Sequence, residues 1–99
     1  MNIVAVTACP TGIAHTYMAA EQIEKTAKAG GHTIKVETQG AMGIENELSG
    51  SEIAKADVVI FAVDIEVEQR ERFEGKTIVE VGVSQAIKNP QDVLTKAGC

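Results

Sequence analysis

The amino-acid sequence predicts an α/β fold: one domain over residues 1–99, in which helices cover both faces of an open sheet of four parallel strands in the order 2-1-3-4, giving three layers. Short β-branched runs alternate with segments whose apolar residues recur every three or four positions, which is the pattern of strands joined by helices. The 99 residues are 44% hydrophobic and 23% charged. This length suits one compact domain, and this composition is too apolar for a disordered chain.

The first predicted unit is a strand, a tight loop and a helix. Residues 2–8 (NIVAVTA) are mostly small or β-branched and carry no charge, which favours an interior strand that ends before Cys9. From Gly12 onward the apolar period becomes that of a helix, and Gly30 and Gly31 are expected to end it. The buried face expected for this helix consists of Ile13, Tyr17, Ala20, Ile23 and Ala27.

Three further strands are predicted, and their charge pattern suggests their places in the sheet. Residues 33–38 (TIKVET) alternate apolar and polar positions, as an edge strand does, whereas residues 58–63 (VVIFAV) are apolar throughout. In residues 77–82 (TIVEVG), Glu80 interrupts the apolar run, which again indicates an edge. With right-handed connections, strands 1 and 3 lie inside and strands 2 and 4 outside, in the order 2-1-3-4.

Short helices are expected between and after these strands. Ser49 and Glu52 have the spacing of a capping box, which predicts a helix with Ile53 facing inward. Residues 39–48 are expected to form the one long irregular connection. The other predicted helices cover residues 67–73, begin with a cap at Ser84, and run from Asn89 and Pro90 to Gly98.

Charge and cysteine content exclude several classes of function. Nine Lys and Arg against fourteen Asp and Glu give a net charge of −5 without a basic cluster, which argues against a nucleic-acid partner. The two cysteines are far apart and show no metal-ligand spacing, so neither a metal nor a cofactor is expected. No apolar run approaches the ~20 residues that span a bilayer, and residues 1–8 lack the basic start of a secretory leader. A cytoplasmic protein without direct membrane insertion is therefore expected.

The most informative string is CPTGIAHT, residues 9–16, between the first strand and its helix. Backbone N–H groups in such a loop and first helical turn lack intrahelical acceptors, and the helix dipole favours an anion there. Gly12 permits backbone angles that turn these groups inward, Pro10 restricts the loop, and Thr11 and Thr16 add hydroxyl donors. The string predicts a phosphate-binding loop, whose N–H donors are those of Thr11, Gly12, Ile13, Ala14 and His15.

Cys9 begins this loop, where a negative charge is stabilised. We expect its pKa to lie below the ordinary ~8.5 of a cysteine, so that the nucleophilic thiolate is present at neutral pH. Attack on phosphorus would produce a phosphocysteine whose oxygens are surrounded by donors. The competing interpretation is an inert buried thiol, which is less favoured at a strand end before such a loop.

The loop has no cationic side chain, since Lys25 is the first Lys or Arg of the chain. A Walker-type nucleotide loop ends in Lys. A cysteine-dependent phosphatase has an Arg at the sixth position after its Cys, where it binds the transition state with two hydrogen bonds; that position is His15 here. An Asp-Pro pair for the leaving-group acid is also missing. This pattern indicates a carrier that forms a phosphocysteine without hydrolysing it.

The string CPTGIAHT resembles the phosphocysteine signature of the fructose-type enzyme IIB domains of the bacterial phosphoenolpyruvate-dependent sugar phosphotransferase system. The resemblance covers essentially the whole chain, including VETQG at residues 36–40 and ADVVIFAVD, which ends at Asp64. An eight-residue signature in a matching context is specific.

The resemblance implies a phosphoryl relay. A phosphohistidine of enzyme IIA would donate its phosphoryl group to Cys9, and Cys9 would pass it to a fructose-type sugar in the membrane component, enzyme IIC. The protein would then be cytoplasmic and associate with the inner face of the membrane through enzyme IIC. The phosphorylated cysteine of the family corresponds to Cys9, and its phosphate loop to Pro10, Thr11, Gly12, Ile13, Ala14, His15 and Thr16.

Two other functions are considered on the residues alone. The first is a small cysteine-dependent phosphatase or arsenate reductase, which would turn over an aryl phosphate by itself. The second is a flavodoxin-like binding module without chemistry. The composition argues against it, because the three aromatic residues (Tyr17, Phe61 and Phe73) lie outside the predicted loops and leave nothing to stack on a flavin.

Further residues are expected beside the site, because the carboxyl ends of parallel strands meet at one edge. Asp64 is interpreted as a solvated carboxylate or helix cap, since a receiver-type phospho-acceptor would need acidic residues after the first strand. Gln39, Gly40 and Gly43 are expected in a flexible loop, with a contact role left open. His15 either bonds to the backbone of the first turn or contacts the phosphate or an acidic partner, and both interpretations stay open.

The charged stretch after the third strand is interpreted as a solvated helix face, with a partner surface as the alternative. Its charged residues are Glu66, Glu68, Arg70, Glu71 and Arg72. The last residue, Cys99, is interpreted as incidental or as marking a domain boundary.

Overall fold

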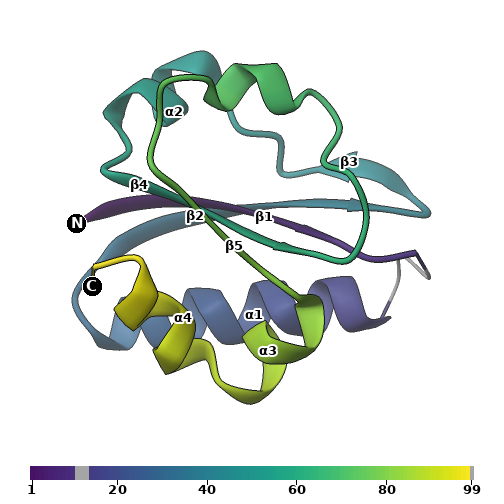
Figure 1. Ribbon diagram of the computed structural model, residues 1–99, viewed down its shortest axis with the longest axis horizontal. Coiled ribbons are helices and arrows are strands. Elements are labelled where there is room, and N and C mark those ends of the chain that lie inside the picture. Colours follow the sequence, from purple (N-terminus) through teal and green to yellow (C-terminus); the bar gives the residue numbers. More distant parts are fainter. Residues whose placement is uncertain (11–13, 99) are drawn as a thin grey trace.

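The chain folds into one mixed sheet between two layers of helices, and the computed structural model describes residues 1–10 and 14–98. The strand order is β3-β2-β1-β4-β5 (Figure 1). The elements in chain order are β1 (Asn2–Ala8), α1 (Ala14–Ala29), β2 (Thr33–Gly40), β3 (Gly43–Glu45), α2 (Gly50–Lys55), β4 (Val58–Val63), the 3₁₀ helix η1 (Arg70–Phe73), β5 (Ile78–Val81), α3 (Val83–Lys88) and α4 (Pro90–Lys96).

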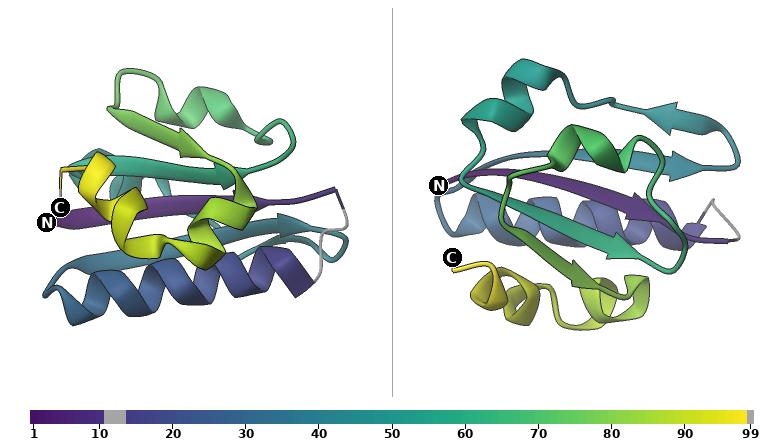
Figure 2. Two further views of the ribbon diagram at one scale, coloured as in Figure 1. Left: turned by 60° about the horizontal axis from the view of Figure 1, so that its bottom comes forward. Right: turned by 45° about the horizontal axis from the view of Figure 1, so that its top comes forward.

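Helices cover both faces of the sheet, as the sequence predicts. Helices α1, α3 and α4 pack on one face, and α2 and η1 lie over the other (Figures 1 and 2). Across the described residues, none of the helices has both the length and the apolar character needed to pass through a lipid bilayer. The α/β class and the three-layer arrangement are therefore confirmed.

The centre of the sheet is formed by β1 and β4, which pair in parallel. Their side chains alternate between the two helix layers: Ile3 and Ala5 pack in the cluster with α1, and Val4 and Val6 pack in the cluster with α2. All six residues of β4 are buried. A strand covered on both faces favours apolar residues, because a charge there must be paired, and these two strands carry no charge.

The sheet differs from the prediction at one edge. The four expected parallel strands are present in the expected order, but β3 pairs antiparallel with β2 as a fifth strand. Residues 39–48 are therefore not one irregular connection, because a tight hairpin closes where Gly43 adopts a φ of 89°. Strand β2 is consequently interior, and its second half, including Glu37 and Gln39, is buried.

Helix α1 presents a slightly different face to the sheet than predicted. Its buried residues are Thr16, Ala19, Ile23 and Ala27, whereas Tyr17 is 38% exposed and Ile13 lies outside the described residues. The buried positions still follow the three-and-four spacing. Small side chains at two of these positions let the helix approach the sheet closely, and the phenol of Tyr17 stays at the rim, where its hydroxyl has a polar partner.

The short helices agree only in part with their predicted caps. Ser49 and Glu52 form the predicted capping box, and Ile53 is buried. Pro90 is the first residue of α4, as expected. The predicted cap at Ser84 is wrong, because Gly82 occupies that position and Ser84 lies inside α3. The helix expected at residues 67–73 is limited to the single 3₁₀ turn η1.

The interpretation of residues 66–72 as a solvated helix face is wrong for Arg72. Its side chain is 17% exposed and makes two parallel hydrogen bonds to Glu37, at 2.8 and 2.9 Å. The Glu37 side chain is fully buried and also accepts hydrogen bonds from the backbone N–H of Leu48 and from Gln39. Arg72 further lies 4.9 Å from the ring centre of Phe73. This buried pair fixes the segment before and within η1 on top of β2.

Charge compensation decides the ionisation of Glu37. Burial alone raises the pKa of this carboxyl, but the hydrogen bonds from Arg72, Leu48 and Gln39 outweigh burial and hold the pKa below its usual range. The same pairing raises the pKa of the Arg72 guanidinium. Glu37 is therefore ionised in the folded protein at neutral pH.

Replacing Glu37 with Gln should lower the free energy of unfolding at pH 7 by about 3–5 kcal/mol, because Arg72 loses its buried anionic partner. The pKa of Glu37 is lowered from its ordinary value of 4.5. Its stabilising contribution is therefore fully present above that value and is lost as the pH falls through the lower folded pKa. In urea titrations, the difference between the two proteins should shrink from pH 7 to pH 3.

A matched control breaks a surface pair instead. Glu80 bonds to Arg70 at 3.2 Å with both side chains about half exposed, so Glu80→Gln should cost under about 1 kcal/mol. If Glu37→Gln lost the same free energy of unfolding at pH 7 and at pH 3, the role assigned to the charge of Glu37 would be contradicted.

Candidate functional site

The carboxyl ends of the parallel strands meet at one edge of the sheet, and Cys9 follows the central strand there. The preceding residue, Ala8, is paired with Gln39 on one side and with Val63 on the other. The backbone N–H of Asp64 donates to the carbonyl of Ala8 at 2.9 Å. The ends of β1, β2 and β4 are therefore held in register around Cys9.

Cys9 lies in a depression of about 350 Å³, which we call the Cys9 depression. Cys9 is only 7% exposed. The described residues that line the depression include two carboxylates and no Lys, Arg or His. They are Cys9, Pro10, Gln39, Gly40, Ala41, Ile65, Glu66 and Glu68.

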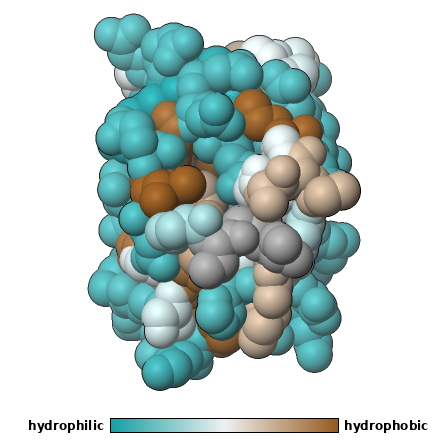
Figure 3. Space-filling view, turned by 90° about the vertical axis from the view of Figure 1, so that its right-hand side faces the viewer, coloured by the Kyte–Doolittle hydropathy of each residue, from teal (hydrophilic) through white to brown (hydrophobic). Residues whose placement is uncertain are grey.

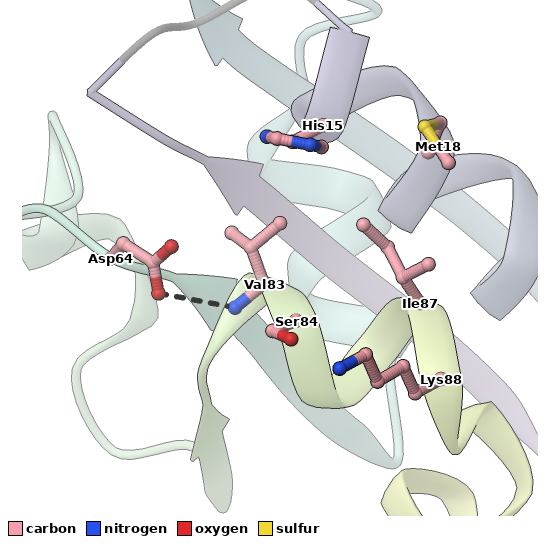
Figure 4. Close-up of a pocket in the computed structure, with 7 residues that line it drawn as sticks. All are labelled: His15, Met18, Asp64, Val83, Ser84, Ile87 and Lys88. Carbon is pink, nitrogen blue, oxygen red and sulfur yellow. Dashed lines mark hydrogen bonds between the residues drawn. The ribbon is translucent and has the colours of Figure 1, made fainter.

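A second hollow of about 230 Å³, which we call the His15 depression, lies between the start of α1 and α3 (Figure 4). His15 and Asp64 both line it, and Lys88 adds a cationic group. Asp64 accepts a hydrogen bond from the backbone N–H of Val83 at 3.2 Å, drawn as the dashed line in Figure 4. Val83 is the first residue of α3, whose N-cap position is Gly82, so Asp64 holds the start of this helix from the segment after β4 while its side chain stays exposed.

The predicted site residues are thus divided between two hollows. Cys9, Pro10, Gln39 and Gly40 come together in one, and His15 and Asp64 in the other. Thr16 lines neither of them: it is fully buried, and its hydroxyl has no hydrogen-bond partner in the described structure. Ala14 is exposed. The predictions for Thr11, Gly12, Ile13 and Cys99 lie outside the described residues.

Exposed apolar side chains gather at the same edge. Figure 3 faces this edge and shows hydrophobic side chains among the hydrophilic ones. Four exposed large side chains lie in the segments that follow β1, β2 and β4: Tyr17, Met18, Met42 and Ile65, with exposures of 38%, 47%, 75% and 42%. We call these four residues the apolar rim.

The apolar rim is anchored by a hydrogen bond between two elements. The hydroxyl of Tyr17 on α1 donates to the carboxylate of Glu45 on β3. This bond raises the pKa of Tyr17, because loss of the phenol proton would place two negative charges together. The β2–β3 hairpin is thereby held beside the start of α1.

Sequence reasoning missed part of the Cys9 depression. Glu66 and Glu68 line it, although their charge pattern indicated a solvated helix. The assignment of Gln39, Gly40 and Gly43 to a flexible loop is wrong, because Gln39 and Gly40 end β2 and Gly43 begins β3. Gln39 is moreover 4% exposed and hydrogen-bonded. The predicted three-layer arrangement already indicated that these residues are buried. Because helices cover both faces of the sheet, polar strand residues such as Glu37 and Gln39 face a covered layer and need hydrogen-bond partners there.

Among residues 1–10 and 14–98, no group of three or more His, Cys, Asp or Glu side chains has an arrangement that could hold a metal ion. The side chains that line the two depressions include the thiol of Cys9, several carboxylates, the imidazole of His15 and the ammonium group of Lys88.

Comparison with known proteins identifies the family. Residues 4–96 match the family described as "PTS system, Lactose/Cellobiose specific IIB subunit". The chain is 55% identical over 95 residues to the "PTS system fructose-like EIIB component 2" of Escherichia coli, covering 96% of this chain and 90% of that protein. It is 50% identical to part of the fructose-specific EIIABC component of Bacillus subtilis, of which it spans 15%.

Solved structures agree with these relatives. A domain of the fructose-specific IIABC component from Borrelia burgdorferi superposes with a TM-score of 0.92 at 52% identity, covering 96% of this chain and 90% of that one. An arsenate reductase in a phosphate-bound state superposes with a TM-score of 0.56 at 13% identity, which shows a shared fold only. The Escherichia coli and Bacillus subtilis relatives are named as fructose-like and fructose-specific components. The chain therefore belongs to the fructose-type EIIB components of the sugar phosphotransferase system.

Proposed function

We propose that residues 1–99 act as one EIIB unit that carries a phosphoryl group on Cys9 during sugar uptake. The observation that carries this proposal is the position of Cys9, at the carboxyl end of the central strand and before the start of α1, in a depression shared with β2 and the segment after β4. In α/β sheets, ligands bind at this edge. Residues 10–16 would form the phosphate loop, and the backbone N–H groups of residues 11–15 would donate to the phosphoryl oxygens.

The first step is transfer from a phosphohistidine of enzyme IIA. The Cys9 thiol loses its proton, and the thiolate attacks phosphorus. As the S–P bond forms, the N–P bond breaks, and its electron pair returns to the imidazole of the donor. In the second step a hydroxyl oxygen of a fructose-type sugar held by enzyme IIC attacks phosphorus and its proton passes to solvent. As the O–P bond forms, the S–P bond breaks, and its electron pair stays on the sulfur of Cys9 as a thiolate.

The charge of the Cys9 depression supports a carrier over a hydrolase. An enzyme that hydrolyses phosphocysteine benefits from a guanidinium that binds the transition state. The described lining of the Cys9 depression has carboxylates and no cationic side chain. This supports the transfer of the group to an incoming sugar and disfavours the alternative of a small phosphatase or arsenate reductase.

The surroundings of Cys9 suit a protein donor. The apolar rim borders the edge where Cys9 lies, and its members project from α1, the β2–β3 turn and the segment after β4. We propose that enzyme IIA docks over the apolar rim and that enzyme IIC uses the same edge in turn, on the cytoplasmic side of the membrane. Relatives in which EIIB is joined to EIIC or EIIA in one chain support partners of this kind.

Replacing Cys9 with Ser should abolish phosphoryl acceptance from a phosphohistidine donor, because a hydroxyl is far less ionised than a thiol at neutral pH. Mass mapping of the labelled peptide after incubation with phosphorylated enzyme IIA measures the outcome, and circular dichroism checks the fold. The matched control is Cys99→Ser, which should accept the label as the unmodified chain does. Label retained by Cys9→Ser would contradict the proposal and direct attention to His15 or Asp64.

The isolated chain should not turn over a chromogenic aryl phosphate. The described lining of the Cys9 depression holds no guanidinium to drive hydrolysis. We therefore expect at most one equivalent of phenolate per chain, measured by absorbance until the release has stopped. Continuous release that disappears in Cys9→Ser would favour the phosphatase alternative.

A further inference from the structure

The side-chain amide of Gln39 holds the backbone of Glu68 by both of its ends. Its Nε2 donates to the Glu68 carbonyl at 3.1 Å, and its Oε1 accepts from the Glu68 N–H at 2.8 Å. The side-chain amide therefore pairs with a backbone peptide group as a neighbouring strand would. Gln39 is 4% exposed, so these bonds are shielded from water.

The orientation of this amide is set by the buried Glu37 carboxylate. Glu37 and Gln39 are two residues apart in β2 and lie on the same face of the strand. Glu37 Oε2 accepts from Gln39 Nε2 at 2.7 Å. A carboxylate only accepts hydrogen bonds, so the amino end of the amide must face it, which leaves the amide oxygen for the Glu68 N–H.

The carboxylate is held in turn by groups from two other segments. Arg72 binds both of its oxygens, and the N–H of Leu48 donates to Oε1 at 2.9 Å. A chain of charge-assisted hydrogen bonds thus runs from Arg72 through Glu37 and Gln39 to the backbone of Glu68.

This chain ends in a wall of the Cys9 depression. Gln39 and Glu68 both line the depression, together with Ile65 and Glu66 of the segment after β4. On the other side, the backbone of Gln39 is paired with Ala8, the residue before Cys9. Gln39 therefore connects the strand that carries the thiol with the segment opposite it.

We propose that Gln39 is a positioning residue that sets the distance between Cys9 and the wall formed by residues 65–68. The two hydrogens of its Nε2 are used by Glu37 and by the Glu68 carbonyl, so Gln39 has no N–H to donate to a phosphoryl group. Its effect on transfer is exerted through the wall. This inference rests on the proposed function of Cys9. It replaces the direct contact role that the sequence left open for Gln39 with an indirect one. Without a cationic side chain in the described lining, alignment contributes a large share of the rate.

The test replaces Gln39 with Met, which is similar in length and removes the side-chain hydrogen bonds of Gln39 to Glu37 and to the backbone of Glu68. Amide hydrogen exchange should show faster exchange at the N–H of Glu68. Single-turnover transfer from phosphorylated enzyme IIA to Cys9 should be slowed about tenfold or more at saturating donor. The donor concentration giving half the maximal rate should change less than about threefold, because the apolar rim is intact.

Three further variants serve as controls for this test. Gln91→Met makes the same change at an exposed position of α4 and should behave as the unmodified chain in both measurements. Glu68→Ala removes a carboxylate while leaving the backbone groups that Gln39 holds, so exchange at position 68 should remain slow. Gln39→Asn keeps an amide but is too short to span to Glu68, and it replaces Gln39→Met if that variant does not fold by circular dichroism.

The outcomes separate the two proposals. Fast exchange at Glu68 together with slow transfer supports the positioning role. Transfer within twofold of the unmodified chain, or unchanged exchange at Glu68, overturns that role while leaving Cys9 as the carrier. If neither the unmodified chain nor Gln91→Met accepts a phosphoryl group, the proposed function itself fails, and the role of Gln39 in transfer fails with it.

Discussion

The carboxylate of Glu37 is fully buried, and its two oxygens accept hydrogen bonds from Arg72, Gln39 and the backbone of Leu48. A charge in such a place is tolerated only when donors surround it, since its desolvation would otherwise cost several kcal/mol. The donors come from β2 itself, from the segment leading to α2, and from η1. Packing alone allows small shifts between these segments, whereas the geometry of paired guanidinium and carboxylate groups does not. The hairpin side of the sheet and one wall of the Cys9 depression therefore depend on this one ionised group.

The fold alone does not decide whether the edge transfers or hydrolyses a phosphoryl group. An arsenate reductase has the same architecture at 13% identity, while the fructose-type EIIB relatives share half or more of the aligned residues with this chain. What distinguishes such proteins is the set of side chains at the carboxyl edge. Here the described lining around Cys9 is acidic, and the imidazole of His15 and the ammonium group of Lys88 line a separate hollow. This separation is consistent with a thiol that carries a group between two partners.

Local patterns predicted most of the elements because their signals lie within a few residues. The bounds of β1 and β4 follow from uncharged β-branched runs, and the capping box of α2 follows from Ser49 and Glu52. Helix α1 ends beside the predicted glycines, with Gly31 at a φ of 84°. The fifth strand escaped prediction because three residues, Gly43–Glu45, carry too little periodicity to identify a strand. Tyr17 was placed inside because spacing alone does not show that its hydroxyl reaches Glu45 on another element.

The sequence by itself determined the fold class, the order of the parallel strands and the family, because each depends on local periodicity or on the contiguous string around Cys9. Only the tertiary structure decided the partners of Glu37, the burial of Gln39 and the division of the site residues between two hollows. The contacts from Gln39 to Glu68 and from Glu37 to Arg72 join positions 29 and 35 residues apart. Their polar side chains resemble those of a solvated surface in the sequence, but in the fold the helix layers cover them. The sequence shows which polar residues a strand contains. Whether each of them faces water or a buried partner depends on what packs over the strand.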